Sequence, residues 1–442
     1  MTLPRYPDYK DSGVPWLGEV PGHWESVPAR RLFGEKREPA LDDDEQLSAT
    51  QRYGVIPQRM FMETADQKVV LALAGTGNFK HVEVDDFVIS LRSFQGGIEW
   101  SAHAGCVSPA YTVLRAVRPI HSRYWAYLLK SSAYIDALQT VIVGIREGKN
   151  ITYSQFGGLP VPVPSPEEQT TIACFLDHET AKIDALIAEQ ETLLALLAEK
   201  RQATISHAVT RGLNPNVAMK DSGIAWLGEV PGHWEVLQLR RVVPQFEQGW
   251  SPECEARPVE DGEWGVLKAG CLNGGVFNAG ENKALPSTLE PREQLEVRHG
   301  DVLMSRASGS PKLIGSVACV ENPQPRLMLS DKIFRLVLDD DISGKFFGLA
   351  MSSISLRAQI EQAIGGAEGL ANNLPQASIK EFWLALPLID EQQQIVEFLD
   401  AETAKLDALK AEAQRGIELL KERRNALIAA AVTGKIDVRN AA

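Results

Sequence analysis

Cysteine is scarce in this chain, and the few cysteines are not paired along the sequence. The five of them lie far apart, at Cys106, Cys174, Cys254, Cys271 and Cys319. An odd, scattered set without a C-x-x-C pair argues against a disulfide framework and against a structural zinc site. This usage fits a reduced cytoplasmic protein.

Long apolar runs are absent as well. The longest, such as VVLALA at 69–74, are far shorter than the ~20 residues that cross a membrane. The first residues, MTLPRYPDYKDSG, contain no apolar core of a secretory signal. We therefore expect neither a membrane segment nor a secretory signal.

Motifs of catalysis are missing or incomplete. The segment VGIREGKN at 143–150 lacks the first glycine and the Ser/Thr of a phosphate-binding loop, and AGTGNF at 74–79 is a lone G-x-G. The segment ENK at 281–283 lacks the Pro-Asp pair that precedes it in nuclease centres. Cys174 and His178 lie four residues apart but have no further metal ligand in view. The sequence thus predicts a protein that is not an enzyme by itself, without catalytic residues, cofactor or metal.

The net charge of −13 at pH 7 at first disfavours nucleic acid as a partner. Two segments carry most of the excess, since 167–201 holds eight acidic and three basic side chains and 390–424 holds nine and six. By contrast, 115–150 holds six basic and two acidic side chains, and 298–335 holds six and three. This distribution leaves room for DNA contacts outside the two acidic segments.

What the sequence does contain is an internal repeat. KDSGVPWLGEVPGHWE at 10–25 returns as KDSGIAWLGEVPGHWE at 220–235, and we call these two segments the opening repeats. A second pair, EEQTTIACFLDHETAKIDAL at 167–186 and DEQQQIVEFLDAETAKLDAL at 390–409, aligns without gaps. Because an internal repeat decides how a fold is read, we predict two half-molecules in tandem. The tryptophans of the opening repeats are predicted as core or helix-docking aromatics.

The second pair lies in two long segments that have no internal proline and carry apolar residues at alternating steps of three and four. These residues are Ile172, Leu176, Ile183, Leu186, Leu193 and Leu197 in the first segment and Ile395, Leu399, Leu406, Leu409, Ala413, Leu420 and Leu427 in the second. The heptad pattern predicts two long helices. We expect them to pair as an antiparallel coiled coil with pseudo-two-fold symmetry. A parallel pair, and packing of each helix on its own globular unit, are the alternatives.

The globular units combine strand-like segments with short helical ones. The strand-like segments are 68–75, 81–94 and 111–117 in the first unit and 264–270, 300–308 and 332–338 in the second, and the helical ones are 122–141 and 344–364. We predict an α+β (mixed α/β) fold, with two globular domains of twisted, largely antiparallel sheets separated by the two long helices. The predicted boundaries are 1–163 and 213–388 for the globular domains and 164–212 and 389–442 for the helices.

These motifs resemble the specificity subunit of type I restriction–modification systems. The resemblance rests on WLGEVPGHWE, on FLD-x-ETAK-[IL]-DAL and on the AVT…G ending, each present twice, and it covers essentially the whole chain. It implies two target-recognition domains, each of which reads one half of a bipartite DNA site. It also implies that the helices set the spacer and dock two adenine-methyltransferase subunits, that motor–nuclease subunits join the full complex, and that the subunit itself is not catalytic.

Base reading in the major groove requires Arg or Lys for guanine and Asn or Gln for adenine. In each unit, the loop after the central strand and the polar loop before the long helix offer such residues. The candidate DNA-binding residues are Arg92, Ser93, Gln95, Arg146, Lys149, Asn150 and Gln155 in the first unit and Arg306, Ser308, Ser310, Lys312, Asn372, Asn373 and Gln376 in the second. The candidate partner-binding residues on the two helices are Phe175, Lys182, Phe398 and Lys405.

Two other functions are compatible with these residues. A non-catalytic, protein-only coiled-coil scaffold would show no preference among DNA sequences and would need no base-reading loops. A specificity subunit of a related methylase or nuclease outside type I would share the same architecture. Sequence preference on DNA tests the first alternative, and the neighbouring genes test the second.

Overall fold

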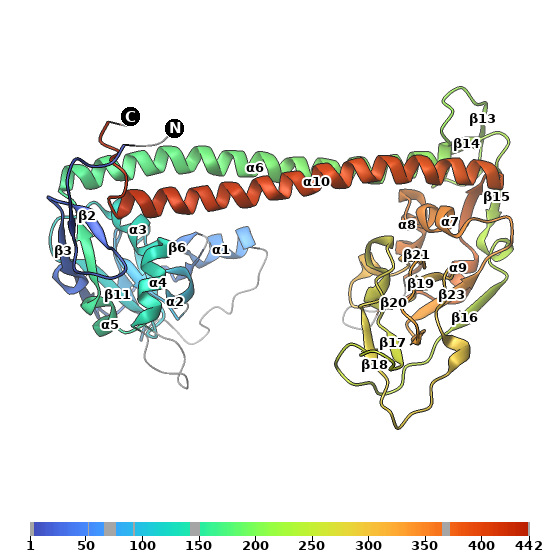
Figure 1. Ribbon diagram of the computed structural model, residues 1–442, viewed down its shortest axis with the longest axis horizontal. Helices are drawn as coiled ribbons and strands as arrows, with labels where there is room; N and C mark the ends of the chain where they lie inside the picture. Colours follow the sequence, from blue (N-terminus) through green and yellow to red (C-terminus); the bar gives the residue numbers. More distant parts are fainter. Residues whose placement is uncertain are drawn as a thin grey trace. The chain divides into compact units, whose positions relative to one another are not determined.

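The computed structural model describes residues 4–51, 53–65, 77–91, 93–141, 151–364 and 372–440 (Figure 1). The chain divides into two compact units: unit 1 comprises Met1–Glu191 with Arg415–Ala442, and unit 2 comprises Thr192–Gln414. Each unit therefore holds one globular part and portions of both long helices. In the described part of the chain, no helix is long and apolar enough to cross a membrane.

The two long helices are α6 (Pro166–Arg211, 46 residues) and α10 (Ile389–Val432, 44 residues). Each begins with two acidic residues in its first turn, Glu167 and Glu168 in α6 and Asp390 and Glu391 in α10. Carboxylates at a helix N-terminus are stabilised by the helix dipole and by unpaired backbone N–H groups. The sequence therefore specifies the start of each helix locally.

The two helices run antiparallel in both units. In unit 1, Ile172 near the start of α6 shares a core with Val432 at the end of α10. In unit 2, Ile205 near the end of α6 shares a core with Ile395 near the start of α10. The start of one helix meets the end of the other in each case, which confirms the predicted antiparallel pairing.

Three leucines of the predicted heptad seam lie on the surface instead. Leu186, Leu193 and Leu409 are 46%, 41% and 50% exposed. A strict heptad drifts by about 20° per repeat relative to a helix with about 3.6 residues per turn. Burial along the predicted seam is interrupted rather than lost, since the later positions Leu197 and Ala413 are buried again.

An ion pair joins the two helices at the same repeat position in each unit. In unit 1, Arg424 Nε lies 2.8 Å from Asp184 Oδ1, and in unit 2, Arg201 Nη1 lies 2.6 Å from Asp407 Oδ1. All four side chains are at least 32% exposed. Solvent therefore screens both pairs.

Replacing Arg424 with alanine should lower the free energy of unfolding by less than about 1 kcal/mol, because exposed ion pairs contribute little. A double-mutant cycle with Asp184→Asn, followed by denaturant unfolding, should give a coupling energy of about 0.2–1 kcal/mol that disappears at about 1 M salt. The same cycle on Arg201 and Asp407 is the matched comparison. A coupling energy above about 2 kcal/mol in either cycle would contradict this account.

In unit 2, the opening repeat docks on both long helices. His233 Nε2 lies 2.8 Å from the carboxylate of Glu391, and Trp234 donates its Nε1–H to the same carboxylate at 3.1 Å. Trp234 is fully buried, and a Cβ added at Gly212 would lie 3.3 Å from its ring. Gly212 ends α6 with a φ of +73°, which favours glycine. Trp226 differs from the prediction, because it is 43% exposed.

Unit 1 repeats this arrangement. His23 Nε2 lies 2.9 Å from Glu168 at the start of α6, and Trp24 is fully buried. Gly434, with a φ of +74°, follows α10, and a Cβ added there would lie 3.0 Å from the Trp24 ring. Each opening repeat thus joins the first turn of one long helix to the glycine that ends the other. Trp16 is half-buried and donates its Nε1–H to the Pro160 carbonyl at 3.1 Å.

The globular part of unit 1 contains, in chain order, β1 (Tyr9–Asp11), β2 (Glu19–Pro21), β3 (Glu25–Pro28), η1 (Ala29–Arg31), β4 (Phe33–Lys36), β5 (Leu47–Thr50), β6 (Gly54–Pro57), α1 (Gln58–Ala65), β7 (Lys80–Val82), β8 (Phe87–Ile89), α2 (Ser93–Gly96), β9 (Glu99–Trp100), β10 (Gly105–Val107), β11 (Thr112–Ala116), α3 (Ser122–Lys130), α4 (Ser132–Thr140), α5 (Tyr153–Gly158) and β12 (Pro160–Val163). Its largest sheet is antiparallel, in the order β4-β11-β8-β9. The helix α3 lies beneath the C-terminal end of α10 (Figure 1), and Tyr124 donates its hydroxyl to the Val432 carbonyl at 3.0 Å.

The globular part of unit 2 contains β13 (Met219–Asp221), β14 (Glu229–Pro231), β15 (Glu235–Gln238), η2 (Leu239–Arg241), β16 (Gln245–Gln248), β17 (Gly265–Leu267), η3 (Ala269–Gly275), β18 (Asn282–Ala284), η4 (Glu293–Leu295), β19 (Val302–Ser305), β20 (Ala307–Ser308), η5 (Pro311–Leu313), β21 (Val317–Cys319), β22 (Leu327–Met328), β23 (Ile333–Val337), α7 (Gly344–Met351), α8 (Ile354–Ala363), β24 (Asn372–Asn373), α9 (Gln376–Lys380) and β25 (Trp383–Leu386). Its largest sheet, β16-β23-β19-β21, is antiparallel and matches that of unit 1. The predicted α+β fold is therefore present in both units. The predicted strand at 68–75 lies outside the described residues.

Each predicted helical segment of the globular parts is two helices rather than one. Ser131 separates α3 from α4, and its side chain accepts a hydrogen bond from the Tyr134 backbone N–H. Ser353 precedes α8 and accepts one from the Leu356 N–H in the same way. Serine favours this N-cap position over a helix interior, so each serine starts a new helix.

The two chain ends meet in unit 1 (Figure 1). The backbone N–H of Asp437 donates to the Pro4 carbonyl at 2.7 Å, and the Tyr9 hydroxyl donates to the Gly434 carbonyl at 3.0 Å. In unit 2, residues 213–218 link the end of α6 covalently to the opening repeat. In unit 1, these noncovalent contacts hold the end of α10 beside the start of the opening repeat. In unit 2, the covalent link 213–218 holds the end of α6 beside its opening repeat.

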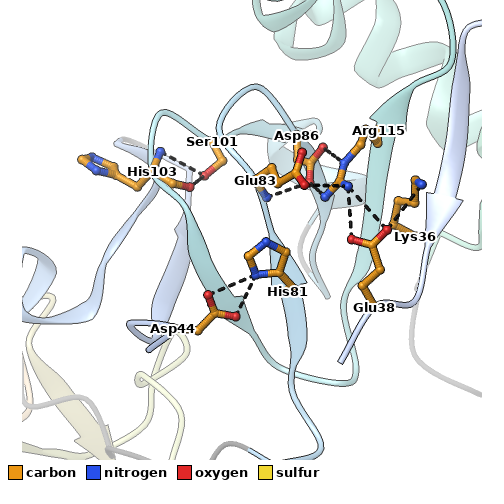
Figure 2. A network of polar contacts seen from close by, with 9 residues as sticks. All are labelled: Lys36, Glu38, Asp44, His81, Glu83, Asp86, Ser101, His103 and Arg115. Carbon is orange, nitrogen blue, oxygen red and sulfur yellow. Dashed lines mark hydrogen bonds and ion pairs between the residues drawn. The ribbon is translucent and has the colours of Figure 1, made fainter. Parts of the chain in front are cut away.

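A largely buried arginine–aspartate pair joins two neighbouring strands in each large sheet. In unit 1, Arg115 of β11 binds both carboxylate oxygens of Asp86 at 2.8 Å, and the Asp86 side chain is only 1% exposed (Figure 2). These hydrogen bonds raise the pKa of Arg115. In unit 2, Arg335 of β23 lies 3.0 Å from Asp301. Asp301 directly precedes β19, as Asp86 directly precedes β8. The pairs belong to the scaffold, because they tie two neighbouring strands of each sheet together.

Candidate nucleic-acid interface

In unit 2, the structure brings the two predicted DNA-binding loops together. The strand β20, after the central strand, pairs with β24, which lies just before the last short helix of the domain. Ala307 faces Asn373 in this ladder, and the Leu374 N–H donates to the Arg306 carbonyl at 2.8 Å. Residues from two segments that are remote in sequence thus form one surface.

Arg306 is the fixed cation of this surface. Its Nε donates to Asn373 Oδ1 at 3.2 Å, and its guanidinium lies 5.3 Å from the centre of the Phe334 ring. Phe334 is held in turn by an edge-to-face contact with Phe246 at 5.9 Å. Within the described part of the chain, the two terminal amino groups of Arg306 have no hydrogen-bond or ion-pair partner. A planar guanidinium with free N–H donors can form paired hydrogen bonds with the edge of a guanine or with a phosphate.

The neighbouring turn of unit 2 presents the remaining predicted residues. Lys312 is exposed on η5, and the Ser310 backbone N–H donates to Ser308 Oγ at 3.2 Å. Arg357 of α8 supports this turn, because its guanidinium donates to the carbonyls of Ile314 and Lys312 at 2.5 and 3.3 Å. Burial lowers the pKa of Arg357. Gln376, the first residue of α9, is half-buried.

In unit 1, two predicted residues have structural roles. Ser93 is 1% exposed, and its Oγ accepts the Ser90 backbone N–H at 2.8 Å. Gln155 forms a capping box with Thr152 at the start of α5, and its Nε2 donates to the Val141 carbonyl at 3.0 Å. Burial contradicts the predicted DNA contact of Ser93, whereas Gln155 is partly exposed and its DNA contact stays a prediction. Their polar side chains satisfy backbone groups nearby, a use that a loop pattern in sequence does not distinguish from DNA contact.

The other predicted residues of unit 1 are described only in part. Gln95 is exposed on α2. Arg92, Arg146, Lys149 and Asn150 lie outside the described residues, as does the side chain of Asn372 in unit 2.

The predicted partner-binding residues occupy matching positions on the two long helices. Phe398 of α10 is 40% exposed, whereas Phe175 of α6 is half-buried and packs against the core of unit 1. Lys182 and Lys405 are exposed and pair with Glu179 and Glu402 of their own helices at 2.7 and 2.6 Å. Phe398 is therefore the apolar side chain of this set that is most available to a partner.

Sequence reasoning missed Phe246, Phe334 and Arg357, which position the candidate DNA-binding residues from other elements. Phe334 lies in an alternating strand segment, where an aromatic residue reads as ordinary core. Arg357 lies within a helix and is 43 and 45 residues from the carbonyls that it binds. Only the folded chain connects them to the loops.

Comparison with known proteins finds similarity to specificity subunits of type I restriction enzymes. Residues 231–419 match the family model for the type I restriction modification DNA specificity domain. The specificity subunit of the type I restriction enzyme EcoEI from Escherichia coli is 31% identical over 388 residues, which cover 70% of this chain and 65% of that protein. The specificity subunit of EcoKI from Escherichia coli K12 is 24% identical, over 80% of this chain and 75% of that protein. The chain thus spans about two thirds to three quarters of the length of these relatives.

Solved structures show the same fold. One is a chain of a structure that describes complex assembly and conformational transition of the type I R-M system. It superimposes with a TM-score of 0.68 at 15% identity, and the alignment covers 93% of this chain and 98% of that chain. The HsdS subunit from Thermoanaerobacter tengcongensis gives a TM-score of 0.50 at 16% identity, with 94% and 98% covered. At these identities, the likeness concerns the fold.

Proposed function

We propose that this chain is a specificity subunit of the type I restriction–modification family, and that it selects the DNA sequence on which a methyltransferase complex acts. Each globular domain reads one half of a bipartite site. The subunit itself is not catalytic and works in the cytoplasm, where its DNA is. No cofactor of its own is required for this task.

One observation carries the proposal furthest, the surface that β20 and β24 build around Arg306 in unit 2. It presents a fixed guanidinium with free donors beside Ser308, Lys312 and Asn373, which are residue types that contact base edges and phosphates. Asn373 orients the arginine before DNA arrives, so less side-chain entropy is lost on binding. The proposed DNA-binding set therefore retains the predicted residues of unit 2 and, in unit 1, Arg92, Gln95, Arg146, Lys149, Asn150 and Gln155.

The long helices supply the second part of the proposal, a spacer between the two readers. Helices of 46 and 44 residues extend about 69 and 66 Å at about 1.5 Å per residue. We assign the spacer to 164–212 and 389–442 and the two readers to 1–163 and 213–388. A fixed separation between readers fixes the separation of the half-sites, as dimer geometry does in other DNA-binding proteins.

The helices also offer a surface for partners. Among their exposed apolar side chains, Leu186 and Leu419 lie in unit 1, and Leu193, Leu196, Phe398 and Leu409 lie in unit 2. Exposed apolar side chains of this size mark protein-binding surfaces when they gather on one element. We propose that adenine-methyltransferase subunits dock there, one on each half of the repeat, and that motor–nuclease subunits join through them.

Replacing Phe398 with serine should weaken co-purification of the methyltransferase about tenfold, because an apolar anchor at an interface typically contributes more than 1 kcal/mol. The fold should persist, since the side chain is already 40% exposed. Leu388→Ser is the matched control, because Leu388 is 76% exposed and precedes α10. Equal losses for both variants, or no loss for Phe398→Ser, would contradict the docking assignment.

A selection experiment tests the proposed function. The chain, purified with its methyltransferase, is mixed with random DNA duplexes, and the bound fraction is sequenced. We expect enrichment of one motif with two defined parts and a fixed gap. Bound DNA without sequence preference would support a protein-only scaffold instead.

A further inference from the structure

Two adjacent arginines follow the opening repeat in both halves of the chain. They are Arg30 and Arg31 in the segment VPARRLFG and Arg240 and Arg241 in the segment LQLRRVVP. The distance to the opening repeat is the same in both halves, although most of the flanking residues differ. The arginine pair is thus a repeated feature that the opening repeat itself does not include.

The same backbone turn carries both pairs. Arg30 and Arg31 end η1, and Arg240 and Arg241 end η2. The first residues of these turns, Ala29 and Leu239, are fully buried. The N–H of Ala29 donates to Leu159 at 3.0 Å, and that of Leu239 donates to Phe382 at 2.8 Å, so each turn is anchored on the chain before the last strand of its domain.

The anchored turns leave the arginines in solvent. All four are exposed. Among the described residues, Arg30, Arg31 and Arg241 have no hydrogen-bond or ion-pair partner for their side chains. Arg240 donates to Gln238 Oε1 and lies 3.5 Å from Glu381, and the Arg240 and Glu381 side chains are both more than half exposed, so solvent can screen this ion pair. Other exposed arginines are neutralised locally, as Arg37 is by Glu35 at 2.9 Å.

Both turns lie beside the element that ends a predicted DNA-binding loop. In unit 1, η1 packs against α5, whose first residues follow the predicted DNA-binding segment 144–150, which lies outside the described residues. A Cβ added at Gly157 of α5 would lie 3.1 Å from Arg30 Cβ. In unit 2, η2 packs against α9, which follows Asn372 and Asn373. Each arginine pair therefore lies beside the helix that follows a proposed base-reading segment of its unit.

We propose that Arg30–Arg31 and Arg240–Arg241 are two phosphate-contact sites, each of which holds the DNA backbone beside one half-site. The inference rests on the proposed function. The two domains have different base-reading loops, so a feature that they share must recognise something common to both half-sites. The sugar–phosphate backbone is common to every sequence, and the arginine fork matches phosphate geometry. In a chain with a net charge of −13, the unpaired cations Arg30, Arg31 and Arg241 are well suited to attract DNA.

The salt dependence of DNA binding tests the proposal. The full chain in complex with its methyltransferase is titrated onto a labelled duplex that contains the methylation motif, and onto one that lacks it, at 50–200 mM salt. Each phosphate contact contributes about 0.9 to the slope of log K against log salt, so Arg30→Gln with Arg31→Gln should reduce the slope by about 2. The ratio of the DNA affinity of the unmodified complex to that of the double variant should then fall about 12-fold between 50 and 200 mM salt. The double variant at Arg240 and Arg241 should behave alike.

Arg37→Gln and Arg257→Gln are the controls, because Arg37 is exposed, Arg257 is partly exposed, and both are ion-paired locally, Arg257 with Glu263 at 2.7 Å. They should leave the slope unchanged. The methylation motif should stay the same in all variants, and both duplexes should lose affinity equally. An unchanged slope, a change confined to one half of the motif, or loss of the methyltransferase from the complex would each overturn the assignment. If the unmodified complex shows no preferred sequence, the proposed function fails, and the slope on any duplex still decides the role of the arginines.

Discussion

Grafting the two loops of unit 2 from a specificity subunit with a different target is expected to replace the second half-site and leave the first unchanged. The grafted segments are 306–316 and 364–376, and they must be exchanged together because β20 and β24 pair with each other. Two altered base pairs cost about 2–6 kcal/mol, which corresponds to a change of preference by a factor of roughly 30 to 20,000. Methylation-site sequencing of the grafted complex measures the change.

The reciprocal graft sharpens this test. Replacing 144–155 in unit 1, a segment that lies largely outside the described residues, should alter the first half-site alone. Trp226→Phe is the control, because Trp226 is exposed on the opening repeat and outside both loops. A graft in one unit that alters both half-sites, or neither, would contradict a model with two independent readers.

Replacing Trp234 with alanine is expected to lower the free energy of unfolding of unit 2 by about 3–5 kcal/mol. The side chain is fully buried and belongs to the core that joins the domain of unit 2 to both long helices. Its removal leaves a cavity beside Gly212 and takes a hydrogen-bond donor from Glu391. Denaturant unfolding, followed by circular dichroism, measures the loss.

The opening repeat supplies the control for that experiment. Trp226 is 43% exposed, so Trp226→Ala should cost less than about 1 kcal/mol. Both variants remove an indole from the same sixteen-residue segment, so they differ chiefly in burial. Equal stability of the two variants would show that the opening repeat is not the junction between domain and helices.

Much of the fold was predictable because the chain repeats itself. The repeats and the 3.6-residue periodicity predict two similar halves and two antiparallel helices, and the structure confirms them. The exact seam was not predictable, since Leu186, Leu193 and Leu409 satisfy the heptad pattern but are exposed, whereas other positions of the same pattern are buried. Ser131 and Ser353 split the short helices by capping, a local effect that apolar periodicity alone does not reveal.

The candidate site was predictable by residue type and less so by geometry. The loops of unit 2 were identified by their polar residues, but Arg306 and Asn373 are 67 residues apart, so their contact required the folded chain. The side chains of Ser93 and Gln155 are of types that can hydrogen-bond to bases, but in this structure both form hydrogen bonds with nearby backbone groups. The carboxylates that pair with His23 and His233 were not predictable from local sequence, because Glu168 and Glu391 lie 145 and 158 residues away.

Mapping of N6-methyladenine tests the central claim most directly. The chain is expressed with its methyltransferase in a host that lacks DNA methylation, and the genomic DNA is sequenced for modified adenines, with and without this chain. The account predicts one two-part motif with a fixed gap, which disappears when the chain is omitted. Methylation that is independent of the chain, or no methylation despite a stable complex, would contradict it.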